Sequence, residues 1–116
     1  MTDFRTIRQL KMSEPILHET TALILSAMGN ARRLQILEAL SHSEMAVGVL
    51  ASTIGLSPSA TSQHLGRLRQ AGLVIPRKQL HEVFYSLSSP QIMDLVTRAQ
   101  HLPIRQRATP YGRKWA

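Results

Sequence analysis

The 116-residue chain contains no cysteine. Disulfide bonds, thiolate metal sites and thiol redox switches are therefore excluded. Long apolar runs are missing too: none approaches the ~20 residues that a membrane-spanning helix needs. The N-terminal residues 1–12 contain no apolar signal core. The length predicts a single domain. The missing signal core leads us to expect a cytoplasmic protein.

Acidic residues are scarce. The chain has 14 Lys and Arg residues against 7 Asp and Glu, which gives a formal net charge of +7 and a pI near 11.1. Such a charge predicts affinity for polyanions, either nucleic acid or an anionic membrane surface. No acidic residue lies between Glu44 and Glu82. A surface that approaches phosphates should exclude carboxylates, so this acid-free window marks the expected binding surface.

Apolar residues at helical spacing predict five helices, over residues 16–28, 31–40, 44–54, 58–71 and 90–102. Asn30 is a suitable N-cap for the second helix. Gly55 ends the third helix. Ser57 followed by Pro58 is a strong start signal for the fourth.

The two sides of the segment 58–71 differ in character. At ~100° per residue, an apolar side is formed by Thr61, Leu65 and Leu68. The opposite side carries small or amide-bearing residues, namely Ser59, Ser62, Gln63, Gly66 and Gln70. A slim face suits a helix that enters the major groove, where glutamine can pair with an adenine edge. With the helix before it, this segment predicts a helix-turn-helix. The alternative is a solvated face on an ordinary helical domain.

Residues 73–87 predict a basic β-hairpin. Strands 73–78 and 83–87 flank a tip near 79–81, and Pro76 is expected on an edge strand. The tip has no Asn-Gly or Asp-Gly turn signal, which leaves the register open. A hairpin directly after a recognition helix is a wing, whose basic residues lie beside phosphates or a minor groove.

The expected fold class is therefore mainly α with a β-hairpin wing. A winged helix-turn-helix domain is predicted over residues 14–102. A basic N-terminal arm (1–13) precedes it, and a basic C-terminal tail (103–116) follows.

Three runs of sequence, NARRLQILEAL, EMAVGVLASTIGLSPSATSQHLGRLRQAGLV and VFYSL, resemble the ArsR/SmtB family of bacterial winged-helix repressors. The resemblance is most specific at Ser59–Leu65 and Leu68–Val74. It implies a homodimer that binds inverted repeats in double-stranded DNA, with the first and last helices pairing across a two-fold axis. The implied dimer interface comprises Leu23, Ile24, Ile92, Leu95, Val96 and Ala99.

The chain departs from the metal sensors of that family at their ligands. The resemblance places Ala46 and Gly48 where some sensors carry cysteines. The positions that bind metal in others are matched by Ser89, Gln91, Leu102 and Arg105. This set does not make a zinc or nickel site, so the chain resembles members without one. A metal site formed by His18 and His101 across the dimer is the remaining alternative.

The candidate DNA-binding residues come from the fourth helix and the wing: Ser57, Ser59, Ser62, Gln63, His64, Arg67, Arg69, Arg77 and Lys78. His64 either reaches a phosphate or packs at the helix edge. His81 contacts either DNA or only water. Arg32 and Arg33 either contact phosphate or pair with Glu38 or Glu14.

Two classes of function fit these residues. One is a sequence-specific transcriptional regulator, expected to be a repressor at promoter DNA in the nucleoid. The other is a non-specific nucleoid-associated protein or a protein-interaction module with a winged helix. The amide-bearing face favours the first, because lysines would suffice for binding phosphate. No carboxylate pair, nucleophile–base arrangement or phosphate-cradling loop appears, so we expect neither enzymatic activity nor a cofactor.

Overall fold

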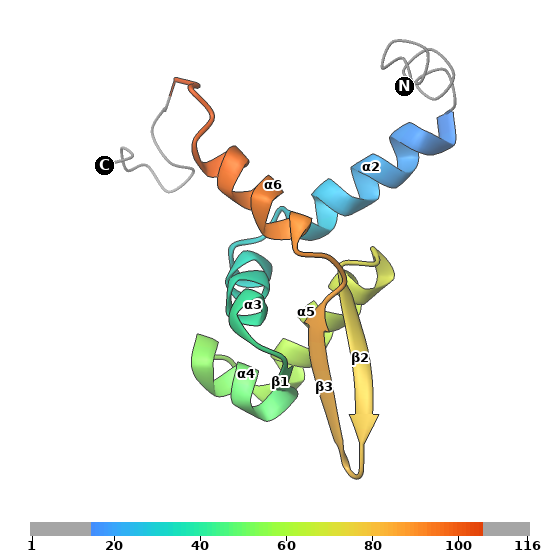
Figure 1. Ribbon diagram of the computed structural model, residues 1–116, viewed down its shortest axis with the longest axis vertical. Coiled ribbons are helices and arrows are strands. Elements are labelled where there is room, and N and C mark those ends of the chain that lie inside the picture. Colours follow the sequence, from blue (N-terminus) through green and yellow to red (C-terminus); the bar gives the residue numbers. More distant parts are fainter. Residues whose placement is uncertain (1–14, 106–116) are drawn as a thin grey trace.

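The computed structural model of the protein describes residues 15–105. The predicted arm (1–13) and the tail beyond residue 105 lie outside the described residues. The elements, in chain order, are α2 (Pro15–Met28), α3 (Ala31–His42), β1 (Met45–Ala46), α4 (Val47–Ile54), α5 (Pro58–Gln70), β2 (Val74–Gln79), β3 (Glu82–Leu87) and α6 (Gln91–Gln100) (Figure 1). The predicted class, mainly helical with a hairpin wing, is confirmed.

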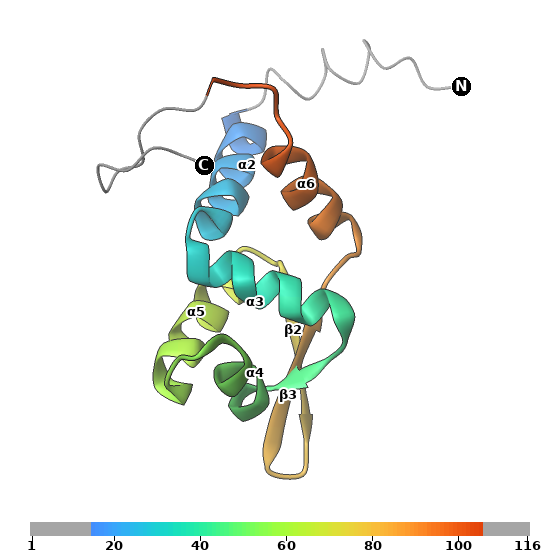
Figure 2. The same cartoon turned by 90° about the vertical axis from the view of Figure 1, so that its left-hand side faces the viewer.

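Helix α3 lies at the centre of the fold, where it contacts all four other described helices and strand β3. Its Ile36 and Leu37 are fully buried, as are Leu50 of α4 and Leu65 of α5. Helices α2 and α6 diverge from α3 at the end of the molecule opposite the wing tip (Figures 1 and 2). The core is therefore shared by all the helices, while the wing projects away from it.

The helix boundaries follow the predicted capping signals. The Asn30 side chain accepts hydrogen bonds from the amides of Arg32 and Arg33, at 2.9 and 3.1 Å. Ser57 Oγ accepts one from the Ala60 amide at 3.1 Å, which caps α5. Gly55 ends α4 with a φ of 74°, a conformation that glycine adopts without steric cost. Both ends of the turn before α5 are thus fixed by local chemistry.

The predicted helix over 44–54 is wrong at its start. Met45 and Ala46 form strand β1, which pairs antiparallel with Tyr85 and Phe84 of β3. The apolar helical spacing itself begins only at Val47, and the extended backbone before it is stabilised by pairing with a distant strand. The last helix is also shorter than predicted, spanning Gln91–Gln100 rather than 90–102.

The wing is built from β2 and β3, with the strands in the order β1-β3-β2. Pro76 lies on the edge strand β2, as predicted. The last cross-strand pair is Gln79 with Glu82, so Leu80 and His81 form a two-residue turn. Leu80 is 85% exposed and has a φ of 56°, which is uncommon for a residue other than glycine. Hairpin turns of type II′ place glycine at this first loop position.

We predict that Leu80→Gly raises the free energy of unfolding by about 0.5–1 kcal/mol. A left-handed conformation costs a side-chain-bearing residue ~1–2 kcal/mol, and the flexibility of glycine offsets part of the gain. Leu80→Ala is the control, because it keeps the strain and removes little packing. Denaturant titrations at one protein concentration measure the difference. Equal stability of the two variants would show that the turn is not strained.

Candidate nucleic-acid interface

Helix α5 has one buried side and one exposed side, divided as the sequence predicts. Thr61, Leu65 and Leu68 have 0% exposure. The exposed residues of the helix include Ser59, Ser62, Gln63, Gly66, Arg67, Arg69 and Gln70. Since the buried side fixes the rotation of the helix, its slim polar face is held toward solvent. Helix α5 itself contacts strand β2 of the wing.

The middle of this face is hollowed. Gln63, Gly66, Arg67 and Gln70 line an open depression of roughly 500 Å³. A Cβ atom added at Gly66 would meet nothing within 4 Å in the described part of the chain. Internal packing therefore gives no reason for glycine at this position. Its effect is to let an external surface approach the helix backbone.

The hydroxyl of Ser57 caps the N-terminus of α5. It accepts a hydrogen bond from the Ala60 amide, and the Ser57 carbonyl accepts one from Thr61 Oγ1 at 2.9 Å. A hydroxyl that accepts can still donate its own hydrogen. Ser57 can therefore cap the helix and donate to a phosphate at the same time.

Several cations near α5 are free of acidic partners. Within residues 15–105, Arg67, Arg69 and Lys78 form no ion pair. Arg67 and Arg69 lie in the last turn of α5, where a positive charge also stabilises the C-terminal end of a helix. Because α5 lies within the acid-free window, the helix itself carries no carboxylate that could compensate these charges.

Arg32 and Arg33 are engaged inside the protein. Arg32 Nη1 donates to the Ile54 carbonyl at 3.0 Å, and Arg33 Nε donates to the Ala27 carbonyl at 2.5 Å. Neither arginine pairs with Glu38, so the predicted ion pair with this glutamate is wrong. Glu14, the other predicted partner, lies outside the described residues. Both arginines tie α3 to the ends of neighbouring helices.

His64 is half-buried at the edge of α5. Burial, followed by the positive charges of Arg33 and Arg32, lowers the pKa of His64 below its ordinary value of 6.5. This lowering favours the neutral imidazole at pH 7. These surroundings favour the packed alternative, and a phosphate contact by His64 would be that of a neutral donor.

Arg77 is occupied rather than free. Its Nη2 and Nε atoms donate to the two carboxylate oxygens of Glu44 at 2.7 and 3.0 Å, and Nη1 donates to Gln79 Oε1 at 2.7 Å. Its guanidinium carbon also lies 5.0 Å from the centre of the Phe84 ring. No local pattern in the sequence predicts this ion pair, since the partners lie 33 positions apart.

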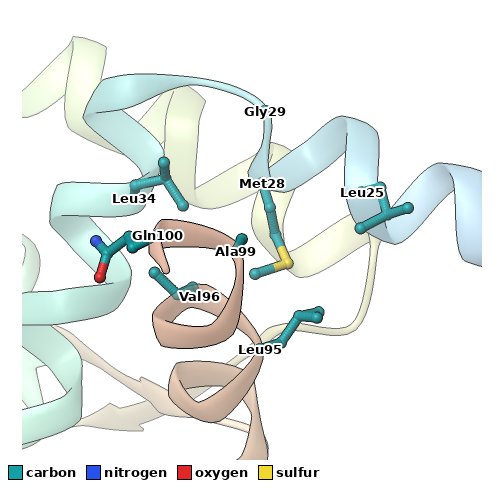
Figure 3. A pocket seen from close by; sticks show the side chains of 8 residues that line it. All are labelled: Leu25, Met28, Gly29, Leu34, Leu95, Val96, Ala99 and Gln100. Carbon is teal, nitrogen blue, oxygen red and sulfur yellow. The ribbon is translucent and has the colours of Figure 1, made fainter. Parts of the chain in front are cut away.

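A second exposed surface is apolar and lies on α2 and α6. Leu23 and Leu95 are 51% and 43% exposed. Leu25, Met28, Leu95 and Ala99 help to line a pocket of about 380 Å³ where the two helices diverge from α3 (Figure 3).

Two of the six residues predicted for the dimer interface are instead buried in the core of the protomer. Ile92 and Val96 are 8% and 4% exposed and belong to the core of the protomer. Apolar helical spacing does not separate core from interface, and both residues belong to the buried core cluster. The exposed surface is made instead by their neighbours on α6 and by α2.

The described residues form no group of three or more His, Asp or Glu side chains that could hold a metal ion. Between residues 15 and 105 there is also no helix long and apolar enough to span a membrane.

A central helical core, an exposed slim helix and a basic hairpin define a winged helix-turn-helix DNA-binding protein. Residues 30–75 match the family described as bacterial regulatory protein, arsR family. The chain is 41% identical over 97 residues to the nodulation protein NolR of Rhizobium meliloti, covering 81% of this chain and 80% of that protein. It is 50% identical over 74 residues to the transcriptional activator HlyU of Vibrio cholerae, covering 64% and 68%.

Solved structures agree with these relatives. The crystal structure of NolR from Sinorhizobium fredii has a TM-score of 0.68 and 43% identity, covering 78% of this chain and 93% of that one. A homodimeric winged helix-turn-helix DNA-binding domain from Mycobacterium bovis, solved by NMR, has a TM-score of 0.66 and 27% identity over 85% and 84%. The chain belongs to the ArsR family of DNA-binding transcriptional regulators, which are not enzymes.

We predict that Gly66→Ala stabilises the protein and weakens its binding to DNA. Alanine should raise the free energy of unfolding by about 0.5–1 kcal/mol, because glycine is a poor helix former. The added methyl group should lower the affinity for a preferred duplex roughly tenfold by keeping the helix away from the bases.

Gly48→Ala is the matched control, because Gly48 also faces open space but lies on α4. Thermal unfolding and fluorescence anisotropy measure the two effects. Full affinity in the Gly66→Ala variant would show that this face does not approach DNA closely.

Proposed function

We propose that this regulator is a homodimeric repressor that binds an inverted-repeat operator through α5 and the wing. The observation that carries the proposal is the exposed face of α5, where an amide, hydroxyls and a glycine lie in an acid-free window. A protein that only coated DNA would be served by lysines at these positions. This argues against the alternatives of a non-specific nucleoid protein and a protein-interaction module.

Two kinds of contact are proposed for the DNA-binding residues. Ser62 and Gln63 project from the middle of α5 and read base edges in the major groove. Phosphates are bound by the remaining helix residues and the wing, namely Ser57, Ser59, His64, Arg67, Arg69 and Lys78. Arg77 lies in the same region, but its guanidinium is paired with Glu44. No metal or cofactor takes part in this proposal.

The apolar surface of α2 and α6 supports the homodimer. An exposed apolar patch of this kind is usually covered by a partner. The proposed interface consists of Leu23, Ile24, Leu25, Leu95 and Ala99, and Ile92 and Val96 support it from the core. A two-fold axis there presents two copies of α5 to one duplex. The half-sites are then inverted and lie about 34–36 Å apart, one helical turn of DNA.

The effect on transcription follows from where the operator lies. A dimer bound over a promoter excludes RNA polymerase, which is repression. HlyU is named an activator, so the family also contains regulators of the opposite sign. We propose repression for this chain, acting in the cytoplasm on the nucleoid. Measuring transcription in vitro with and without the protein, from a promoter that contains the selected operator, tests the sign directly.

We predict that Gln63→Ala weakens binding to the preferred duplex by about 1–3 kcal/mol and changes binding to a scrambled duplex little. The preference should relax at one base pair in each half-site. Lys78→Ala is the comparison variant: it should weaken both duplexes and reduce the salt dependence by about one unit of slope. The measurement is a salt titration on a duplex that the wild type selects from a random library. Equal losses on both duplexes for Gln63→Ala would remove it as a base reader.

We also predict that Leu95→Glu converts the dimer to a folded monomer with at least ~10-fold lower operator affinity, because a buried charge at the interface is costly. Leu95 is partly exposed, so the protomer core should remain intact. Gln91→Glu places the same charge on an exposed position of the same helix and should leave the dimer unchanged. Sedimentation velocity gives the oligomeric state. A wild type that is already monomeric at micromolar concentration would contradict the interface.

A further inference from the structure

The side chain of Arg77 crosses the sheet. Arg77 lies on the edge strand β2 and is the direct cross-strand partner of Phe84, which in turn faces Ala46 on β1. From β2, the guanidinium passes over the Phe84 ring and reaches Glu44, the residue just before β1. One side chain therefore links the outer strand of the wing to the segment that leads into α4.

The position of this link along the wing is specific. Strand β1 pairs only with Phe84 and Tyr85, so the sheet has three strands at this level. Beyond it, residues 78–83 pair only within the hairpin, which projects away from the helices (Figure 2). A two-stranded hairpin by itself is marginally stable in water. The Arg77–Glu44 ion pair thus lies where the three-stranded part of the sheet ends and the projecting two-stranded hairpin begins.

The bonding of Arg77 leaves its charge compensated. An arginine has five N–H donors, and here two of its nitrogens bind both oxygens of one carboxylate while a third binds Gln79. Bidentate pairing of this kind fixes geometry as well as charge. If Arg77 turned to a phosphate, Glu44 would lose its partner and remain as an unpaired negative charge near DNA. Hydrogen bonding to Arg77 also lowers the pKa of the Glu44 carboxyl, which keeps it ionised.

We propose that Glu44 and Arg77 form a brace that holds the wing in a fixed direction relative to α4 and α5. Arg77 is then a positioning residue, and the adjacent Lys78, which has no ion pair in the described part of the chain, supplies the phosphate contact of the wing. The side chains of Arg77 and Glu44 are 49% and 34% exposed, so the brace adds little to global stability. Its effect is on the direction of the wing. This inference rests on the proposed function.

The direction in which Glu44→Gln changes DNA affinity distinguishes a brace from a direct phosphate contact by Arg77. If the pair is a brace, Glu44→Gln weakens binding to the selected duplex although it removes a negative charge from a DNA-binding protein. Arg77→Gln weakens it by a similar factor, about 3- to 10-fold for a coupled pair. The double variant is no weaker than either single variant. The salt dependence stays unchanged in all three, whereas Lys78→Gln, the control, lowers its slope by about 0.9.

A second measurement uses the free protein. Amide hydrogen exchange at residues 79–83 should be faster in Glu44→Gln and in Arg77→Gln than in the wild type, because the outer hairpin opens more often without the brace. Exchange in α3 should be unchanged, which shows that the domain remains folded. Unchanged exchange in the wing would overturn the brace, whatever the DNA measurements show.

The opposite binding result would also overturn the proposal. If Glu44→Gln tightens binding and Arg77→Gln lowers the salt slope by about one unit, Arg77 is a phosphate contact and Glu44 its competitor. Failure of the proposed function looks different, because the wild type itself would then fail to prefer the selected duplex over a scrambled one. The exchange experiment in the free protein still decides the brace in that case.

Discussion

The burial of one side of α5 determines how the rest of the structure can act. The side chains of Thr61, Leu65 and Leu68 are fully buried. Their burial fixes the rotation of α5 about its own axis. Because side chains three and four positions apart share a face, this rotation also fixes the direction of Ser62, Gln63 and Gly66. The residues buried on one side of α5 therefore determine which residues the other side presents to solvent.

Most of the fold could be predicted from local signals. Asn30, Ser57 and Gly55 mark helix ends through their own side chains or backbone freedom, and they do so in the structure. The failures depend on contacts between distant residues. Strand β1 exists because Met45 and Ala46 pair with a strand some 40 positions away. The Glu44–Arg77 pair depends on that same pairing, and apolar spacing alone could not assign Ile92 to the core.

The candidate site shows why a net charge is an incomplete guide. A formal charge of +7 predicts affinity for polyanions, but it does not say which cations are available. Arg32 and Arg33 bind backbone carbonyls, and Arg77 binds a carboxylate, whereas Arg67, Arg69 and Lys78 have no acidic partner in the described region. The sequence located the exposed face of α5 because helical periodicity is local. It could not sort the arginines, since their partners lie on other elements.

Helices α2 and α6 lie at the end of the molecule opposite the wing tip (Figure 2). In the proposed dimer, the residues that recognise a half-site and the residues that set the spacing between half-sites are therefore separate parts of the chain. Substitutions in α5 can change which bases are preferred while the spacing is kept. Substitutions at Leu25 or Leu95 can alter the spacing while each half-site is still recognised. Operators in different promoters can then diverge in sequence and in geometry independently of each other.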